Sequence, residues 1–311
     1  MDVLRVFFFG RFRVEIDGRE LTELSSAKAQ ELFCYLLLNR ERPHHREILA
    51  SVLWENVSTG QSKQYLRRAL WQLQSTLSEL DLSPDGQLIQ ANNEWIQVNS
   101  QARVWVDAIE FLRGCLSNQG TPGQDLGNEA AVQLRNAIQL YKGNLLDGWY
   151  QEWCLFERER FRQIYLATLD KLMLNCEVSG EYEAGITYGM RILRFDQARE
   201  HTHRRLMRLF CLSGNRTDAL RQYEKCSFVL ERELGIKPSM VTVNLYEKIR
   251  AAQVNTHLAI TVDDSSLFPK REYFMQRVYA ELQQIRGVLI NIHNQVQHQI
   301  EAVEAALDDR S

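Results

Sequence analysis

The 311-residue chain has little of what membrane and secreted proteins need. No apolar run approaches the roughly 20 residues that span a bilayer. The opening MDVLRVFFFG is too short for the apolar region of a signal peptide and lacks a cleavage site. The six cysteines are scattered without a C-x-x-C pair, which favours reduced, mostly buried thiols. We therefore expect a cytoplasmic protein with no membrane partner.

Motifs for catalysis are missing as well. The sequence has no G-x-x-x-x-G-K-[ST] and no G-x-G-x-x-G segment to hold phosphates. His44 and His45 precede a predicted helix and should diverge, and His201 and His203 on one helix should point apart, so neither pair predicts a metal site. No nucleophile, acid–base pair or metal set converges in the sequence. We expect neither enzyme activity nor a cofactor.

Excess charge of either sign is also absent, because the net charge is only −3 with 25% of residues charged. Any anion-binding surface must therefore be a local feature. With 45% hydrophobic residues the chain can bury a sizeable core. Its length favours two or three domains.

The first part of the chain predicts a small α+β unit of about 105 residues, in the order β-β-α-α-α-hairpin. Alternation over residues 3–14, before the turn dipeptide Asp17-Gly18, predicts two short antiparallel strands. Apolar residues at helical spacing predict three helices, over residues 27–39, 46–55 and 60–80. Alternation around two asparagines predicts a hairpin over residues 87–98.

The second part predicts paired helices. Residues 113–128 are rich in Gly, Asn, Gln and Pro and predict a loop between domains. Further on, Gly180, Ala184 and Tyr188 recur as Gly214, Ala219 and Tyr223, with the glycines 34 residues apart and the other pairs 35. This period is typical of tetratricopeptide-like repeats, in which small residues let paired helices approach closely.

Apolar residues near the C-terminus recur at alternating spacings of four and three, at positions 278, 282, 285, 289, 292 and 296, and again at 303 after an interruption at Gln299. This heptad pattern predicts a helix that either forms a coiled coil with a second chain or docks onto the helical domain.

The helix predicted over QSKQYLRRALWQLQ separates two kinds of side chain. At 100° per residue, apolar residues cluster on one side and Gln64, Arg68, Trp71 and Ser75 on the other. Residues 61–78 hold three cations and no carboxylate. Arg and Gln can read base edges and Lys suits phosphate, so this side of the helix is compatible with a nucleic-acid contact. The alternative is a solvated face that serves only solubility.

These segments together resemble the Streptomyces antibiotic regulatory protein family of transcriptional activators, over about residues 3–250. The resemblance rests on LRVFFFGRFRVEIDGREL, QYLRRALWQLQSTL, LYKGNLLDGWYQEWCLFERERF and LERELGIKPSMVTVNLYEKI. It implies a mainly α fold with an OmpR-type winged helix-turn-helix at 1–106, in which 61–77 form the recognition helix and 87–98 the wing. A tetratricopeptide-like bacterial transcriptional activator domain would cover 107–252, and a linker and C-terminal helix 253–311.

The family implies a regulator that binds promoter repeats in double-stranded DNA and recruits RNA polymerase. We expect such a protein to be a homodimer that associates with the nucleoid when bound. The residues expected to contact DNA are Lys63, Gln64, Arg67, Arg68 and Trp71 on the helix, with Asn92 and Asn93 at the tip of the wing.

Departures from the family pattern shape two further expectations. Relatives commonly carry arginine at the positions of Gln72, Gln74 and Ser75, and residues 1–106 hold 12 Lys and Arg against 13 Asp and Glu. Since phosphate contacts supply most non-specific affinity, binding should be weak and salt-sensitive. Trp71, where relatives have a small polar residue, has three interpretations: contact with a thymine methyl or the DNA backbone, an anchor for a protein partner, or burial against the second domain. The alternative function is a protein-interaction adaptor whose winged helix serves assembly.

Overall fold

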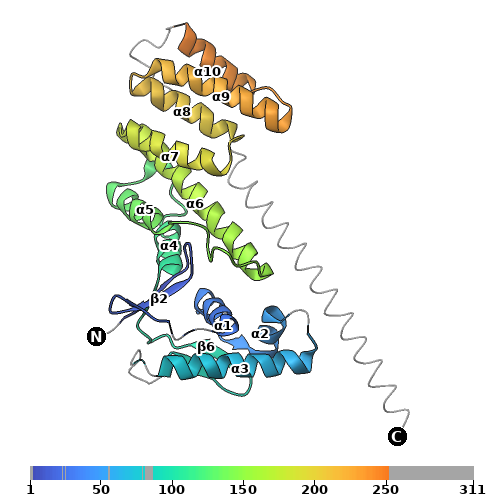
Figure 1. Cartoon of the computed structure of the whole chain (residues 1–311). Coiled ribbons are helices and arrows are strands. Elements are labelled where there is room, and N and C mark those ends of the chain that lie inside the picture. The colour runs from blue at the N-terminus through green and yellow to red at the C-terminus, as the bar shows by residue number, and fades with distance from the viewer. Residues whose placement is uncertain are drawn as a thin grey trace. The chain divides into compact units, whose positions relative to one another are not determined.

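The computed structural model describes residues 3–22, 24, 26–54, 57–78, 80 and 87–251. The described residues up to Arg250 form one compact unit (Figure 1). The predicted heptad helix and its coiled coil lie outside the described residues. The described part is mainly helical with two small sheets, as the sequence predicts.

The first sheet combines neighbouring and distant segments. Strands β1 (Leu4–Phe7) and β2 (Arg13–Ile16) pair antiparallel, as predicted, and β2 turns into β3 (Arg19–Glu20). Strand β7 (Val104–Val106) then adds to β1 in parallel, in the order β3-β2-β1-β7. We did not predict β7, because three residues carry no periodic pattern and their partner lies about a hundred positions earlier.

Three helices and a three-stranded sheet complete the winged-helix part. The predicted helices are present as α1 (Ala27–Leu38), α2 (Arg46–Leu53) and α3 (Thr59–Ser78). The predicted hairpin is present as β5 (Ile89–Ala91) and β6 (Trp95–Val98). The short strand β4 (His44–His45) pairs with β6, so the sheet order is β4-β6-β5.

The remainder of the described chain is a stack of helices that Figure 1 shows in chain order. They are α4 (Asp107–Leu116), the short η1 (Gly123–Asp125), α5 (Asn128–Leu140), α6 (Glu152–Ser179), α7 (Tyr182–Phe195), α8 (Glu200–Leu212), α9 (Arg216–Leu234) and α10 (Met240–Arg250). None of the described helices is both long and apolar enough to cross a bilayer.

The predicted loop over residues 113–128 is wrong in its extent and its place. Helix α4 continues to Leu116, and the loop that follows joins α4 to α5 within the helical part. Gly114 explains the error, because a Cβ on it would lie 2.6 Å from Ala137 Cβ. This glycine allows α4 and α5 to approach closely and does not end the helix.

The helical repeat is present, with one correction to its alignment. Gly180 and Gly214 follow α6 and α8 with left-handed backbone angles (φ of 78° and 84°), which favour glycine. The small residue at the crossing of α6, α7 and α8 is Gly185 and not Ala184, since Gly185 is buried against Cys176 and Leu209. Gly185 precedes the fully buried Ala219 by 34 residues, which is the same spacing as between the two glycines.

The winged-helix and helical parts share a continuous hydrophobic core. Phe9 lies 5.3 Å from Phe111, 4.7 Å from Tyr141 and 5.7 Å from Phe161 between ring centroids. Its neighbour Gly10 donates a backbone hydrogen bond to Asn144 at 2.8 Å. The first strand is therefore fixed to the helical part, while the domain boundary after residue 106 stays a prediction.

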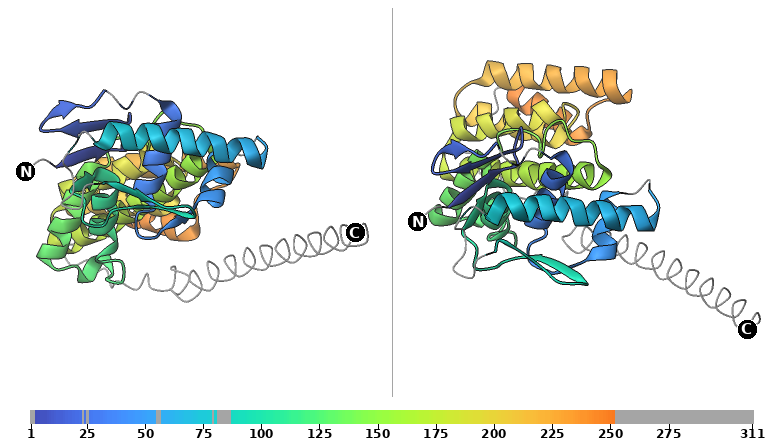
Figure 2. Two further views of the ribbon diagram at one scale, coloured as in Figure 1. Left: turned by 90° about the horizontal axis from the view of Figure 1, so that it is seen from below. Right: turned by 60° about the horizontal axis from the view of Figure 1, so that its bottom comes forward.

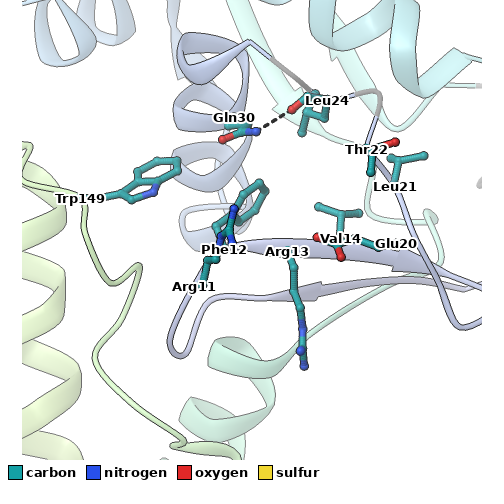
Figure 3. A pocket seen from close by; sticks show the side chains of 10 residues that line it. All are labelled: Arg11, Phe12, Arg13, Val14, Glu20, Leu21, Thr22, Leu24, Gln30 and Trp149. Atoms are coloured by element: carbon teal, nitrogen blue, oxygen red, sulfur yellow. Dashed lines mark hydrogen bonds between the residues drawn. The ribbon is translucent and has the colours of Figure 1, made fainter.

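We call this contact between the winged-helix and helical parts the junction. A small cavity of about 260 Å³ adjoins it, and Figure 3 shows the residues that line the cavity. Phe12 and Trp149 come from the two parts of the chain, with ring centroids 5.8 Å apart. Gln30 of α1 donates a hydrogen bond to the Leu24 carbonyl at 2.6 Å beside them. The junction thus contains polar contacts as well as packed rings.

Candidate nucleic-acid interface

Helix α3 is held by its apolar side. The predicted stripe is confirmed, because its members are at most 4% exposed: Leu66, Ala69, Leu70, Leu73 and Leu77. These residues pack within the same core as α1 and α2. Their burial fixes which side of α3 faces solvent, since i, i+3, i+4 and i+7 positions share one face of a helix.

The opposite side of α3 is open. Gln64, Arg67, Arg68, Trp71 and Ser75 are all exposed. Trp71 is 68% exposed, so its burial against the second domain is excluded. Within the described part of the chain, neither Arg67 nor Arg68 is found in an ion pair. The two guanidinium groups thus face solvent with their donors available to an anion or a base edge.

Lys63 has a different environment from the two arginines. Its Nζ donates a hydrogen bond to Glu47 of α2 and forms an ion pair with it. This contact lowers the pKa of the Glu47 carboxyl. The lysine is therefore the one of the three predicted cations that already has an anionic partner among the described residues. Both side chains remain substantially exposed, so a phosphate could compete for Lys63.

The two asparagines of the wing also differ. Asn92 Oδ1 accepts hydrogen bonds from the backbone N–H groups of Glu94 at 2.9 Å and Trp95 at 2.7 Å. This side chain therefore builds the turn between β5 and β6, as asparagine commonly does. Asn93 is exposed at the tip, with no side-chain hydrogen bond among the described residues. Of the pair, Asn93 has the side chain that is open to a ligand.

Side-chain and backbone contacts of residues that were not predicted as site residues attach the wing to the helices. Gln74 of α3 donates to the Ile89 carbonyl of β5 at 3.1 Å, and the Arg46 N–H donates to the Glu94 carbonyl at 2.8 Å. His45 caps α2 by accepting from the Glu47 N–H, and its ring meets Trp95 at 5.2 Å. Figure 2 shows α3 and the hairpin side by side on one face of the unit.

Sequence periodicity could not identify these attachments, because they join residues between 15 and about 50 positions apart. Gln74 was visible only as a departure from the family pattern, at a position where relatives carry arginine. Its half-buried side chain shows that it supports the wing and does not face outward. Among the described residues, no group of three or more His, Cys, Asp or Glu side chains is placed to hold a metal ion.

Comparison with known proteins finds a family model that matches the helical part of the chain. Residues 106–250 match the family model of the bacterial transcriptional activator domain. This part of the chain is therefore similar to that domain, in agreement with the resemblance stated for the sequence segments. The match is to a family of regulators and not to a class of enzymes.

One solved structure extends the comparison to the N-terminal part. The fold matches Mycobacterium tuberculosis EmbR in complex with a low-affinity phosphopeptide, with a TM-score of 0.61 and 19% sequence identity. The match covers 81% of this chain and 66% of that chain, so this chain spans just under two thirds of its length. A likeness at this identity shows a shared fold. Among curated proteins, none matches the sequence.

Proposed function

We propose that this regulator is a transcriptional activator that binds promoter repeats in double-stranded DNA and recruits RNA polymerase. The observation that carries the proposal is the outward face of α3, where Gln64, Arg67 and Arg68 are exposed beside the wing. A helix of this kind fits the major groove, and a hairpin beside it reaches the backbone or the minor groove. The protein would act in the cytoplasm, at the nucleoid.

Each side chain has a chemical task in this arrangement. The planar guanidinium groups of Arg67 and Arg68 suit guanine O6 and N7 or phosphate, and the Gln64 amide suits adenine N6 and N7. Lys63 would contact phosphate in exchange for Glu47, and Asn93 would contact the backbone from the wing tip. Because residues 1–106 carry a net charge of −1, affinity should be modest and should fall steeply with salt.

The helical part would supply protein contacts. Phe228, Leu234 and Met240, on α9 and α10, are 63%, 58% and 70% exposed. Exposed apolar side chains of this size support an interaction with another protein. The partner would be a second copy of the chain, RNA polymerase, or both. A homodimer would place two reading heads, each formed by α3 and the wing, on one DNA and would raise avidity through effective concentration.

A salt series tests the DNA-binding part of this proposal. Full-length protein is titrated onto pooled promoter-region duplexes, beside an Arg67→Ala/Arg68→Ala variant. We expect saturable binding by the wild type and a loss of roughly tenfold or more in the variant. The slope of log affinity against log salt should be shallower by about 1.8 if both arginines neutralise phosphates, since each contributes about 0.9.

A matched variant separates local contacts from net charge. Arg113→Ala/Arg160→Ala removes two exposed cations from α4 and α6, away from both α3 and α9, so it changes the total charge equally. Binding by this variant should resemble the wild type. If both double variants lose affinity equally, the effect is one of net charge and α3 is not the reading head.

The second candidate function is an adaptor that uses α3 to bind protein. The same exposed apolar residues favour it, together with Trp71. Dimeric wild-type protein that binds no duplex at low salt, but retains a protein partner lost in Trp71→Ala, would establish the adaptor and exclude the DNA-binding proposal.

A further inference from the structure

No described contact that stabilises the fold requires a tryptophan at position 71. Trp71 lies in the middle of the outward face of α3, one turn from Arg67 and Arg68 on one side and from Ser75 on the other. The ring is 68% exposed, and among the described residues no other aromatic ring stacks on it. Leaving an indole in water forgoes the free energy that its burial would release. A partner that buries this ring would therefore come from outside the described fold.

The wing restricts where that partner lies. Gln74, three residues after Trp71, holds β5 through its hydrogen bond to the Ile89 carbonyl. The segment of α3 that carries Trp71 is therefore the segment beside which the wing emerges (Figure 2). If the wing contacts one DNA backbone, this part of α3 faces the adjacent major groove.

The chemistry of indole limits which base it can contact there. The ring offers an apolar surface and one N–H donor, and it has no acceptor. On the major-groove edge of a base pair, only thymine presents an apolar methyl group, and its neighbouring O4 is an acceptor. Cytosine presents an N4 amino donor in the same place, which would face the indole N–H. An indole at this position therefore accepts thymine and disfavours cytosine.

We infer that Trp71 is a specificity-determining residue that selects thymine, through its 5-methyl group and O4, at one position of the bound DNA sequence. This inference rests on the proposed DNA-binding function and names the base that the recognition helix selects. The flanking arginines add donors for guanine or phosphate but no apolar surface. Trp71 is thus the side chain of this face that can sense a methyl group.

Base analogues test the inference directly. The probe is a duplex selected from a random pool by the full-length protein, with each thymine replaced singly by deoxyuridine. Deoxyuridine keeps O4 and lacks the methyl group. At one position we expect wild-type affinity to fall about fourfold, the equivalent of the ~0.8 kcal/mol expected for one buried carbon. In Trp71→Ala the same replacement should change affinity less than twofold.

A second analogue and a second variant separate the two contacts. Replacing that thymine–adenine pair by 5-methylcytosine paired with guanine keeps the methyl group and exchanges the O4 acceptor for an amino donor. The wild type should then lose more than tenfold. Trp71→Phe should keep its sensitivity to deoxyuridine and lose most of its sensitivity to 5-methylcytosine, because phenylalanine offers the ring without the N–H.

The control is Phe156→Ala, which removes a 70% exposed aromatic ring from α6. This variant should bind every duplex as the wild type does. The inference is overturned if the wild type binds its selected duplex but no thymine shows a methyl effect that depends on Trp71. It is also overturned if Trp71→Ala binds like the wild type. If the wild type selects no duplex, the proposed function fails and this inference fails with it.

Discussion

The junction between the two parts of the chain and the outward face of α3 differ in whether their side chains have partners within the fold. At the junction, large rings and charged groups have partners within the fold: Phe9 packs among three rings, and the carboxylate of Asp107 accepts three backbone N–H groups. On α3, the guanidinium groups of Arg67 and Arg68 and the ring of Trp71 face solvent. One surface contributes stability, and the other leaves its chemistry available.

Contacts at the junction orient α3. Trp153 of α6 donates through Nε1 to the buried Glu31 of α1 at 3.1 Å and meets Tyr35 edge-on at 5.4 Å. Because α1 packs against α3 and against α6, the helical part sets the direction in which α3 faces. A flexible tether between the two parts would not do this.

The largest effect should come from cutting the junction. Phe161 of α6 is fully buried between Phe9 and Phe111, so Phe161→Ala should lower the free energy of unfolding by about 3–5 kcal/mol. Phe161→Leu should cost less than Phe161→Ala, because leucine leaves a smaller cavity. In both variants the winged-helix and helical parts should unfold in one transition, measured by denaturant titration with circular dichroism and tryptophan fluorescence.

The matched control for this change lies five residues earlier on the same helix. Phe156 is 70% exposed, so Phe156→Ala should change stability by no more than about 0.5 kcal/mol. Equal losses at the two positions, or two separate transitions in the Phe161 variants, would show that the junction does not join the two parts energetically.

The next effect concerns the carboxyl group at the junction. Burial raises the pKa of Asp107 from 3.8 to about 6, although N–H groups of Phe8, Phe9 and Ala108 oppose the shift. Between about pH 4 and pH 6 the folded state therefore retains a proton that the unfolded state has released. The stability that this group contributes is present below pH 4 and is lost as the pH rises to about 6.

Asp107→Asn removes this titration and provides the reference. The unfolding free energy of the wild type minus that of the variant should fall by about 3 kcal/mol from pH 4 to pH 6 and then stay constant. The measurement is a set of denaturant titrations at half-unit steps of pH. A difference that instead rises over this interval would mean that the three N–H donors outweigh burial and lower the pKa.

The same contrast explains what the sequence could predict. The face of α3 was predictable because burial of Leu66, Leu70 and Leu77 repeats with the helix period, and the residues left over define the exposed side. Asn92 and Asn93 marked the turn for a similar local reason. Such features depend on residues within a few positions of one another.

The junction was not predictable, because it depends on contacts across the chain. Asp107 meets Phe8 about a hundred positions away, and Glu31 meets Trp153 over 122 positions. The pairing of Lys63 with Glu47 is also a contact between separate elements that no local pattern shows. It changes the chemistry of the site that the local pattern predicted. A periodic pattern shows which side of α3 is exposed, but not which of its cations already has a partner.

The smallest effect should come from that pair. Glu47→Gln removes the carboxylate that holds Lys63 and leaves the lysine free for phosphate, so DNA affinity at low salt should rise about two- to threefold and the salt slope should steepen by up to about 0.9. Glu110→Gln is the control, because Glu110 pairs with Arg113 on α4 and the change in net charge is the same. An equal rise in both variants would assign the effect to net charge. A rise only in Glu47→Gln would show that α3 presents two free cations at rest and a third only when a phosphate displaces its carboxylate.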